Sequence, residues 1–151
     1  YSALPKLLER SGNFECGSIT GIYTVLVEGD DTNEPISDTV RGIVDGHIVL
    51  SRQVAMRNHY PAIDVLASVS RLMNEIAAPE HNAVAGKLRN MLSVYQENQD
   101  LILIGAYKSG SNPALDEAIR HIDAINKLLQ QRVDEKVGFD ETVAQMQEIL
   151  S

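Results

Sequence analysis

Apolar residues recur with helical spacing along the second half of the chain. In residues 80–104 they are separated by three, four or seven positions, which places them on one face of a helix. This face carries Val84, Leu88, Met91, Leu92, Tyr95 and Ile102. Gly105 follows the last of them and is expected to end the helix. The pattern therefore predicts one long amphipathic helix.

Two further helices are predicted after residue 110. Asn112 can cap a helix that has Pro113 at its first position, a combination that favours helix initiation. Asp140 is predicted to cap a last helix after an interruption at Gly138. The apolar faces of the two helices carry Leu115, Ile119, Ile122, Ile125 and Leu129, and then Val143, Met146 and Leu150. Three amphipathic helices with short connections predict a helical bundle.

The first half of the chain has the pattern of an α/β layer. Residues 19–27 are almost continuously apolar and rich in β-branched side chains, which predicts a strand buried on both faces, as in a parallel sheet. Residues 47–50 predict a second short buried strand. Short helices are expected over residues 4–10, with Leu7 and Leu8 facing inward, from a cap at Ser37 or Asp38 to residue 44, and from a cap at Ser51 to residue 57.

A mixed run, residues 59–71, separates the two halves. Pro61 disfavours the helical conformation of Tyr60, so we expect the tyrosine on a turn. Arg71 closes the run with a planar guanidinium that suits phosphate. On chemistry alone neither residue indicates a function, because a Tyr-Pro pair is usually a packed turn and a single arginine is usually a surface or ion-pair residue.

Charge and composition restrict the partners and the compartment. The 151 residues carry a net charge of −8 with no basic block to offset it, which argues against a nucleic-acid partner. A single cysteine, Cys16, excludes an internal disulfide and fits a reducing compartment. The longest apolar run, residues 101–107, is too short to span a membrane.

Two further features are weighed on the residues alone. The sequence begins without methionine and without a signal-peptide pattern, so we expect it to start inside a longer protein. His47 and His59 have no cysteine or carboxylate at ligand spacing, and we interpret both as structural.

Several longer stretches resemble the flagellar and type III secretion export ATPases, which are relatives of rotary ATPase catalytic subunits. The stretches are, in chain order, residues 17–20 (GSIT), 23–31 (YTVLVEGDD), 45–52 (DGHIVLSR), 59–64 (HYPAID) and 68–71 (SVSR). The resemblance covers almost the whole chain, closely to Arg71 and more loosely beyond it. Residues 28–31 and 105–110 look more like the flagellar ATPase, and the injectisome ATPases are the nearest alternative.

The resemblance implies a fold and an activity. The implied fold is α/β, with residues 1–78 as the C-terminal portion of a RecA-like domain and residues 79–151 as a C-terminal helical domain. The implied activity is hydrolysis of ATP with Mg²⁺ by a hexameric ring that energises protein export. The sequence contains no Gly-x-x-x-x-Gly-Lys loop, and no strand that ends in aspartate followed by Ser or Thr. We therefore expect the phosphate and magnesium sites outside this chain, and no hydrolysis by the chain alone.

The resemblance also implies roles for single residues. Arg71 matches the arginine finger that reaches the nucleotide site of the neighbouring subunit. Tyr60 matches the aromatic residue against which adenine stacks. The second aromatic residue of the rotary subunits has no clear counterpart, because Val133 stands near its position and Phe139 is displaced from it.

The acidic loop at residues 28–34 has both a plain and a specific interpretation. Asp30, Asp31 and Glu34 can simply belong to a solvated loop, whereas the resemblance places them at the central pore, facing a coiled-coil stalk. The loop at residues 106–113 is mildly basic and polar where rotary subunits are strongly acidic. Other implied partners are an export gate and substrate–chaperone complexes, with a cytoplasmic location at the inner-membrane base of the flagellum. The alternative from another class is a non-catalytic module that binds a stalk or chaperone.

Overall fold

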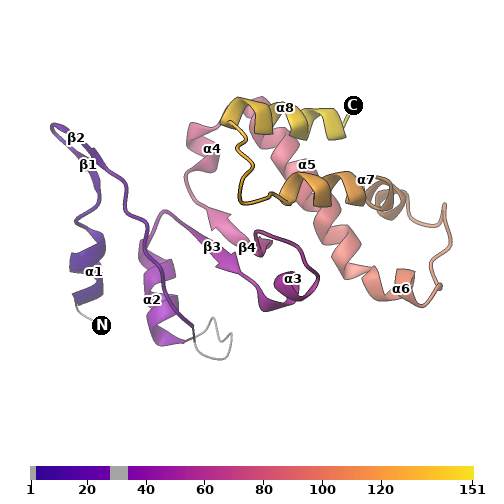
Figure 1. The fold of residues 1–151 in the computed structure, drawn as a ribbon, viewed down its shortest axis with the longest axis horizontal. Coiled ribbons are helices and arrows are strands. Elements are labelled where there is room, and N and C mark those ends of the chain that lie inside the picture. The colour runs from indigo at the N-terminus through magenta and orange to yellow at the C-terminus, as the bar shows by residue number, and fades with distance from the viewer. Residues whose placement is uncertain (1–2, 28–33) are drawn as a thin grey trace. The chain divides into compact units, whose positions relative to one another are not determined.

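The computed structural model describes residues 3–27 and 34–151 (Figure 1). They form two compact units, Tyr1–His47 and Ile48–Ser151. In the first unit, α1 (Ala3–Leu8) packs on α2 (Pro35–Ile43), and each helix has a buried apolar side chain, Leu8 and Val40. Between the two helices, β1 (Gly12–Phe14) and β2 (Gly17–Ile19) form an antiparallel hairpin that the sequence analysis did not predict.

The predicted buried strand at residues 19–27 is wrong. Ile19 ends β2, and residues 20–27 have no regular secondary structure. The side chains of Ile22 and Leu26 are 93% and 90% exposed. A strand exists only where its backbone pairs with another strand, and no strand in residues 3–27 and 34–151 pairs with this segment. The apolar pattern therefore indicated that these side chains favour burial, but it did not show whether a second strand pairs with them.

The helices of the first unit begin earlier than predicted. α2 starts at Pro35, so Ser37 is a buried residue within the helix and not its cap. Proline suits this first position because the amide that it lacks has no partner inside a helix. Leu8 is buried as predicted, but the prediction that Leu7 faces inward is wrong, because Leu7 is 49% exposed.

A pair of strands follows α2 along the chain. β3 (Gly46–Leu50) pairs with β4 (Ile63–Ser70), and α3 (Arg52–Met56) lies between them in the sequence. The Ser51 cap is confirmed, because its Oγ accepts a hydrogen bond from the Val54 amide at 3.4 Å. Burial of β3 on both faces is wrong: burial alternates along the strand, and Ile48 is 72% exposed. A pair of strands covered on one side leaves every second side chain open.

The helical bundle is confirmed. Figure 1 shows α5 (Pro79–Glu97) running past α7 (Pro113–Leu129) and α8 (Phe139–Ile149), and α5 packs against both of them. Shorter helices, α4 (Met73–Ile76) and α6 (Gln99–Leu103), flank α5. The bundle core joins predicted apolar positions with the fully buried Ala118: Leu88, Met91, Leu92, Ala118, Ile122, Ile125 and Met146.

The structure tests the predicted ends of three helices. Asn112 caps α7 as predicted, since its Oδ1 accepts from the amides of Ala114 at 3.1 Å and Leu115 at 3.2 Å. The single helix predicted for residues 80–104 is divided at Asn98, whose side chain donates to the Val94 carbonyl at 2.8 Å. Asp140 lies in the first turn of α8 and does not cap it; the cap position is Gly138.

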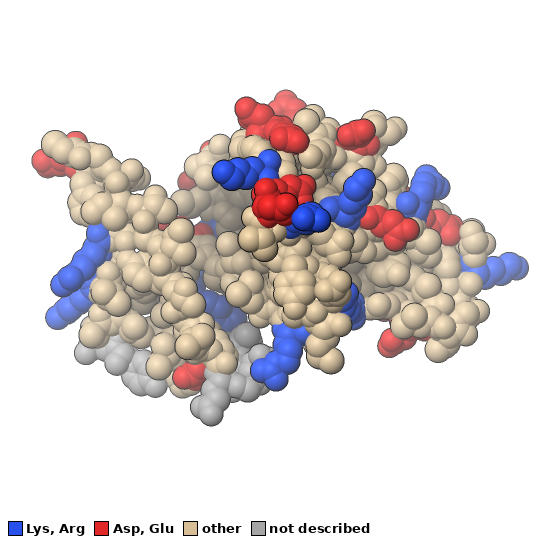
Figure 2. All heavy atoms as spheres, viewed as in Figure 1, with Lys and Arg blue, Asp and Glu red and all other residues tan. Residues whose placement is uncertain are grey.

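The charged side chains are mixed in sign. On the face that Figure 2 shows, acidic and basic side chains of the helical part lie interspersed and form no single basic field. Across residues 3–27 and 34–151, no helix combines the length and the apolar character that crossing a membrane requires.

Candidate functional site

Arg71 lies directly after the last residue of β4. It occupies a bend before α4, and its side chain is exposed, like that of Ser70 before it. An exposed arginine at a strand exit presents a permanent positive charge at the protein surface.

Side-chain hydrogen bonds shape the strand that leads to Arg71. The Oδ1 atom of Asp64 accepts from the amides of Leu66 at 3.1 Å and Ala67 at 2.9 Å. Ser68 Oγ donates to the Asp64 carbonyl at 2.6 Å and accepts from the Val49 amide at 3.0 Å. The sequence analysis assigned no role to Asp64 or Ser68, although both residue types commonly bond to backbone a few residues away. The two side chains therefore hold a bent stretch of β4 in one conformation.

Tyr60 lies on the turn between α3 and β4, as predicted, and is 55% exposed. The peptide bond to Pro61 is cis. The Tyr60 carbonyl accepts a hydrogen bond from the Gln131 amide at 3.0 Å, just beyond the end of α7. The turn is thereby attached to the helical bundle while a large part of the aromatic side chain stays accessible.

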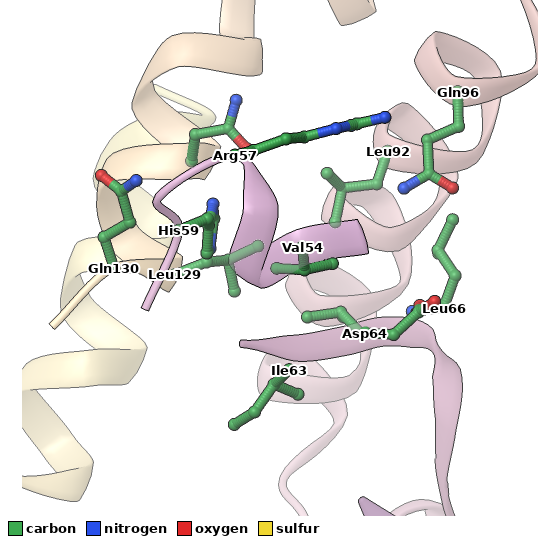
Figure 3. Close-up of a pocket in the computed structure, with 12 residues that line it drawn as sticks. Val54, Arg57, His59, Ile63, Asp64, Leu66, Leu92, Gln96, Leu129 and Gln130 are labelled. Carbon is green, nitrogen blue, oxygen red and sulfur yellow. The ribbon is translucent and has the colours of Figure 1, made fainter. Parts of the chain in front are cut away.

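A pocket of about 250 Å³ lies beside this turn (Figure 3). Residues of α3, β4, α5 and α7 line it. The connecting segments add His59 and Gln130, the sequence neighbours of Tyr60 and Gln131. Neither Tyr60 nor Arg71 belongs to the lining. The structure therefore does not bring the two predicted site residues together in this pocket.

The residues near the expected second aromatic position do not form a partner for Tyr60. Val133 is fully exposed. The Phe139 ring instead packs edge-on against His81, with 5.5 Å between ring centroids and 70° between ring planes. The aromatic ring closest in sequence to the expected position is thus already in contact with another side chain.

Only part of the predicted stalk-facing loop can be placed. Asp30 and Asp31 lie outside the described residues. Glu34 is half-buried at the N-cap of α2, where its carbonyl accepts from the Asp38 amide at 3.0 Å.

Asp116 organises the mildly basic loop before α7. Its Oδ1 accepts from the Tyr107 hydroxyl at 2.8 Å and the Ser109 hydroxyl at 3.3 Å, and its Oδ2 accepts from the Gly110 amide at 2.9 Å. Gly110 has φ +87°, which a residue with a side chain rarely adopts. The Tyr107 hydrogen bond holds the pKa of Asp116 below its ordinary value, and burial together with Asp116 raises the pKa of Tyr107. Asp116 therefore remains ionised as the anchor of a fixed loop.

The fit to magnesium ATP is partial. An exposed tyrosine such as Tyr60 has a ring face on which a base can stack, and an exposed arginine such as Arg71 has a charge that suits phosphate. Within residues 3–27 and 34–151, no cluster of three or more His, Cys, Asp or Glu side chains is arranged to hold a metal ion. The described residues thus include an accessible aromatic ring and an accessible cation.

Comparison with known proteins identifies the family. Residues 1–70 match the nucleotide-binding domain of the ATP synthase alpha/beta family, and residues 77–148 match the C-terminal domain of the type III secretion ATPase EscN. The flagellum-specific ATP synthase of Treponema pallidum is 53% identical over 146 residues, which are 97% of this chain and 33% of that protein. The chain belongs to the flagellar and type III secretion export ATPase family.

Solved structures of this export ATPase family have the same fold. The assembled ATPase EscN from the type III secretion system of enteropathogenic Escherichia coli matches with a TM-score of 0.96 and 42% identity. That match covers 99% of this chain and 36% of EscN. A structure of EscN in complex with its central stalk EscO matches with a TM-score of 0.90 and 40% identity, over 99% of this chain and 35% of that one. The chain thus spans about a third of the length of the relatives it matches.

Proposed function

We propose that this chain is part of an ATPase that energises flagellar protein export, and that it supplies Arg71 and Tyr60 to a homo-hexameric ring. The observation that carries the proposal is the exposed position of Arg71 at the exit of β4, in a chain whose relatives are export ATPases. In this proposal residues 1–78 complete a RecA-like domain and residues 79–151 form the helical domain. The two family matches, which end at residue 70 and begin at residue 77, support this boundary.

The two residues act on different nucleotides in this proposal. Arg71 reaches across the subunit boundary and neutralises the charge that develops on the transferred phosphoryl group, an effect of roughly 10³–10⁵ in rate in arginine-finger systems. Tyr60 stacks on the adenine bound by its own subunit, which contributes about 1–3 kcal/mol per base in nucleic-acid complexes. Bound magnesium, held by residues outside this chain, supplies charge neutralisation at the phosphates.

The 151-residue chain alone is expected to bind Mg-ATP weakly or not at all, because it offers one face for adenine and no phosphate-binding loop. The full-length protein is expected to bind and hydrolyse it. Isothermal calorimetry on both proteins, with phosphate release measured in parallel, checks this. Saturable micromolar binding by the short chain would reveal a nucleotide site that the proposal lacks.

We also propose that the ring surrounds a coiled-coil stalk and works in the cytoplasm at the membrane base of the export apparatus. Support for the stalk comes from EscN, which has been solved in complex with its central stalk. The acidic loop provides the complementary charge for a basic stalk, with Asp30, Asp31 and Glu34 facing the pore. The export gate and substrate–chaperone complexes are further partners in this proposal.

Reversing the charge of Asp30 and Asp31 together in the full-length protein is expected to weaken stalk binding, most strongly at low salt, where charge attraction is least screened. Binding assays across a salt series give the measurement. Reversal of Asp140 and Glu141 on α8, an equal change in net charge, serves as the matched control. Equal affinity of the loop variant and the wild type at low salt would reject the pore-facing role.

A second candidate within the family is an injectisome ATPase, which the match of residues 77–148 to the type III secretion C-terminal domain favours. A third candidate is a non-catalytic module that binds a stalk or chaperone. Isothermal calorimetry with Mg-ATP separates this module from an ATPase. A full-length protein that neither binds nor hydrolyses Mg-ATP belongs to the non-catalytic class.

A further inference from the structure

A single arginine of the helical bundle binds three carbonyls of the strand that leads to Arg71. Arg89, an exposed residue of α5, donates from Nη1 to the Val65 carbonyl at 2.6 Å and to the Ser68 carbonyl at 3.3 Å. Its Nη2 donates to the Leu66 carbonyl at 3.3 Å. Hydrogen bonds from a charged donor are stronger than neutral ones, and the planar guanidinium makes several of them in one fixed geometry.

Side-chain hydrogen bonds within β4 also hold the backbone around these carbonyls. The amides of Leu66 and Ala67 turn to the carboxylate of Asp64, and the Ser68 hydroxyl holds the Asp64 carbonyl. Carbonyls of the same short stretch accept hydrogen bonds from Arg89 of α5. Figure 3 shows Asp64 and Leu66 where the ribbon of β4 bends next to α5. Asp64 and Arg89 therefore bind complementary backbone groups of one bend.

The helical side of this contact is firmly held. Leu88 and Leu92, on either side of Arg89 along α5, are buried in the bundle core. Val65 and Leu66 of the bend pack against the same core. Fixing β4 to a packed helix leaves its end little freedom, because displacement of the strand breaks both apolar contacts and charge-assisted hydrogen bonds.

The hydrogen bonds from Arg89 to β4 end close to Arg71 in the sequence. Ser68 is the last residue of β4 that Arg89 holds, and Arg71 follows three positions later, beyond the exposed Ser70. The direction in which the chain leaves β4 therefore depends on the position of the Ser68 carbonyl. We infer that Arg89 is a positioning residue for Arg71: by binding the carbonyls of Val65, Leu66 and Ser68, it fixes the strand exit from which the finger reaches the neighbouring nucleotide.

This inference rests on the proposed role of Arg71. A finger acts only within a narrow range of positions, and a misplacement of about 1 Å can reduce the rate about a hundredfold. Loss of the Arg89 hydrogen bonds to β4 therefore lowers turnover without removing any group that touches the nucleotide. A lysine at position 89 offers a charge without the planar fork, so it replaces only part of the arginine's contacts.

The test compares Arg89→Met with Lys87→Met in the full-length ring. Lys87 is an exposed cation on the same helix, so the control removes equal charge from α5. We expect Arg89→Met to lower kcat by about tenfold to a hundredfold, with KM for Mg-ATP changed less than about twofold, and Arg89→Lys to lie between this variant and the wild type. Lys87→Met is expected to behave as wild type.

Two further measurements separate positioning from general destabilisation. Amide hydrogen exchange should accelerate in residues 66–72 of Arg89→Met while α7 stays as protected as in the wild type. The double variant Arg71→Ala, Arg89→Met should turn over no more slowly than Arg71→Ala alone, because a residue that acts through Arg71 has nothing left to position.

Each contrary result has a distinct meaning. Normal turnover of Arg71→Ala overturns the proposed function itself, and the role of Arg89 with it. If Arg71→Ala is slow, the inference is overturned by a normal kcat of Arg89→Met, by additive losses in the double variant, or by faster exchange throughout α5 and α7.

Discussion

Replacement of Arg71 by alanine in the full-length protein is expected to remove most of the ATP turnover and to leave folding and nucleotide binding nearly unchanged. The side chain is exposed in a bend, so its removal opens no cavity. Its proposed contact forms with the phosphates of the neighbouring subunit as charge develops during transfer, and such contacts account for roughly 10³–10⁵ in rate. Steady-state kinetics, with nucleotide affinity measured separately, gives the result.

Controls for Arg71 use charge, shape and ring assembly. Arg120→Ala removes an exposed arginine from α7 and is expected to retain turnover. Arg71→Lys should recover little activity, because a point charge does not replace a planar fork.

Mixed rings provide the decisive control. Arg71→Ala subunits are combined with subunits that lack the lysine of the phosphate-binding loop, and activity should return where an intact arginine finger faces an intact nucleotide site. Normal turnover of Arg71→Ala, or assembled mixed rings without recovery, would make Arg71 a structural residue.

Ile125→Ala is expected to lower the free energy of unfolding of the helical unit by about 2–5 kcal/mol. Ile125 is only 1% exposed, and it lies in the core that α5, α7 and α8 share. The shorter side chain loses its burial and leaves a cavity that close-packed helices fill incompletely. Chemical denaturation followed by circular dichroism at 222 nm, the wavelength that reports helix content, measures the change.

Ile119→Ala provides the matched control, because it makes the same substitution on the same helix at a side chain that is 36% exposed. A loss of about 1 kcal/mol or less is expected there, since less apolar area leaves water on folding and part of any gap is filled by solvent. Similar losses at positions 119 and 125 would contradict the assignment of the core.

Local signals in the sequence determined much of the helical half and the identity of the family. The apolar spacing within α5 and α7 selected the buried face, because side chains three and four positions apart share one side of a helix. Asn112 and Ser51 were recognisable as caps because a cap bonds to amides two or three residues away. Tyr60 and Arg71 were selected as candidates through short motifs in a characteristic order, and the turn at Tyr60 follows from its neighbour Pro61.

Tertiary structure alone decided which segments found partners. Residues 20–27 have the composition of a buried strand, yet Ile22 and Leu26 are exposed, because pairing depends on a second strand that local sequence does not specify. Arg89 shows the opposite case: its helical neighbours are core residues, and its partners lie 21 to 24 positions away on β4. The apolar periodicity of the sequence does not predict such a contact, because the contact depends on how the helix and the strand pack together.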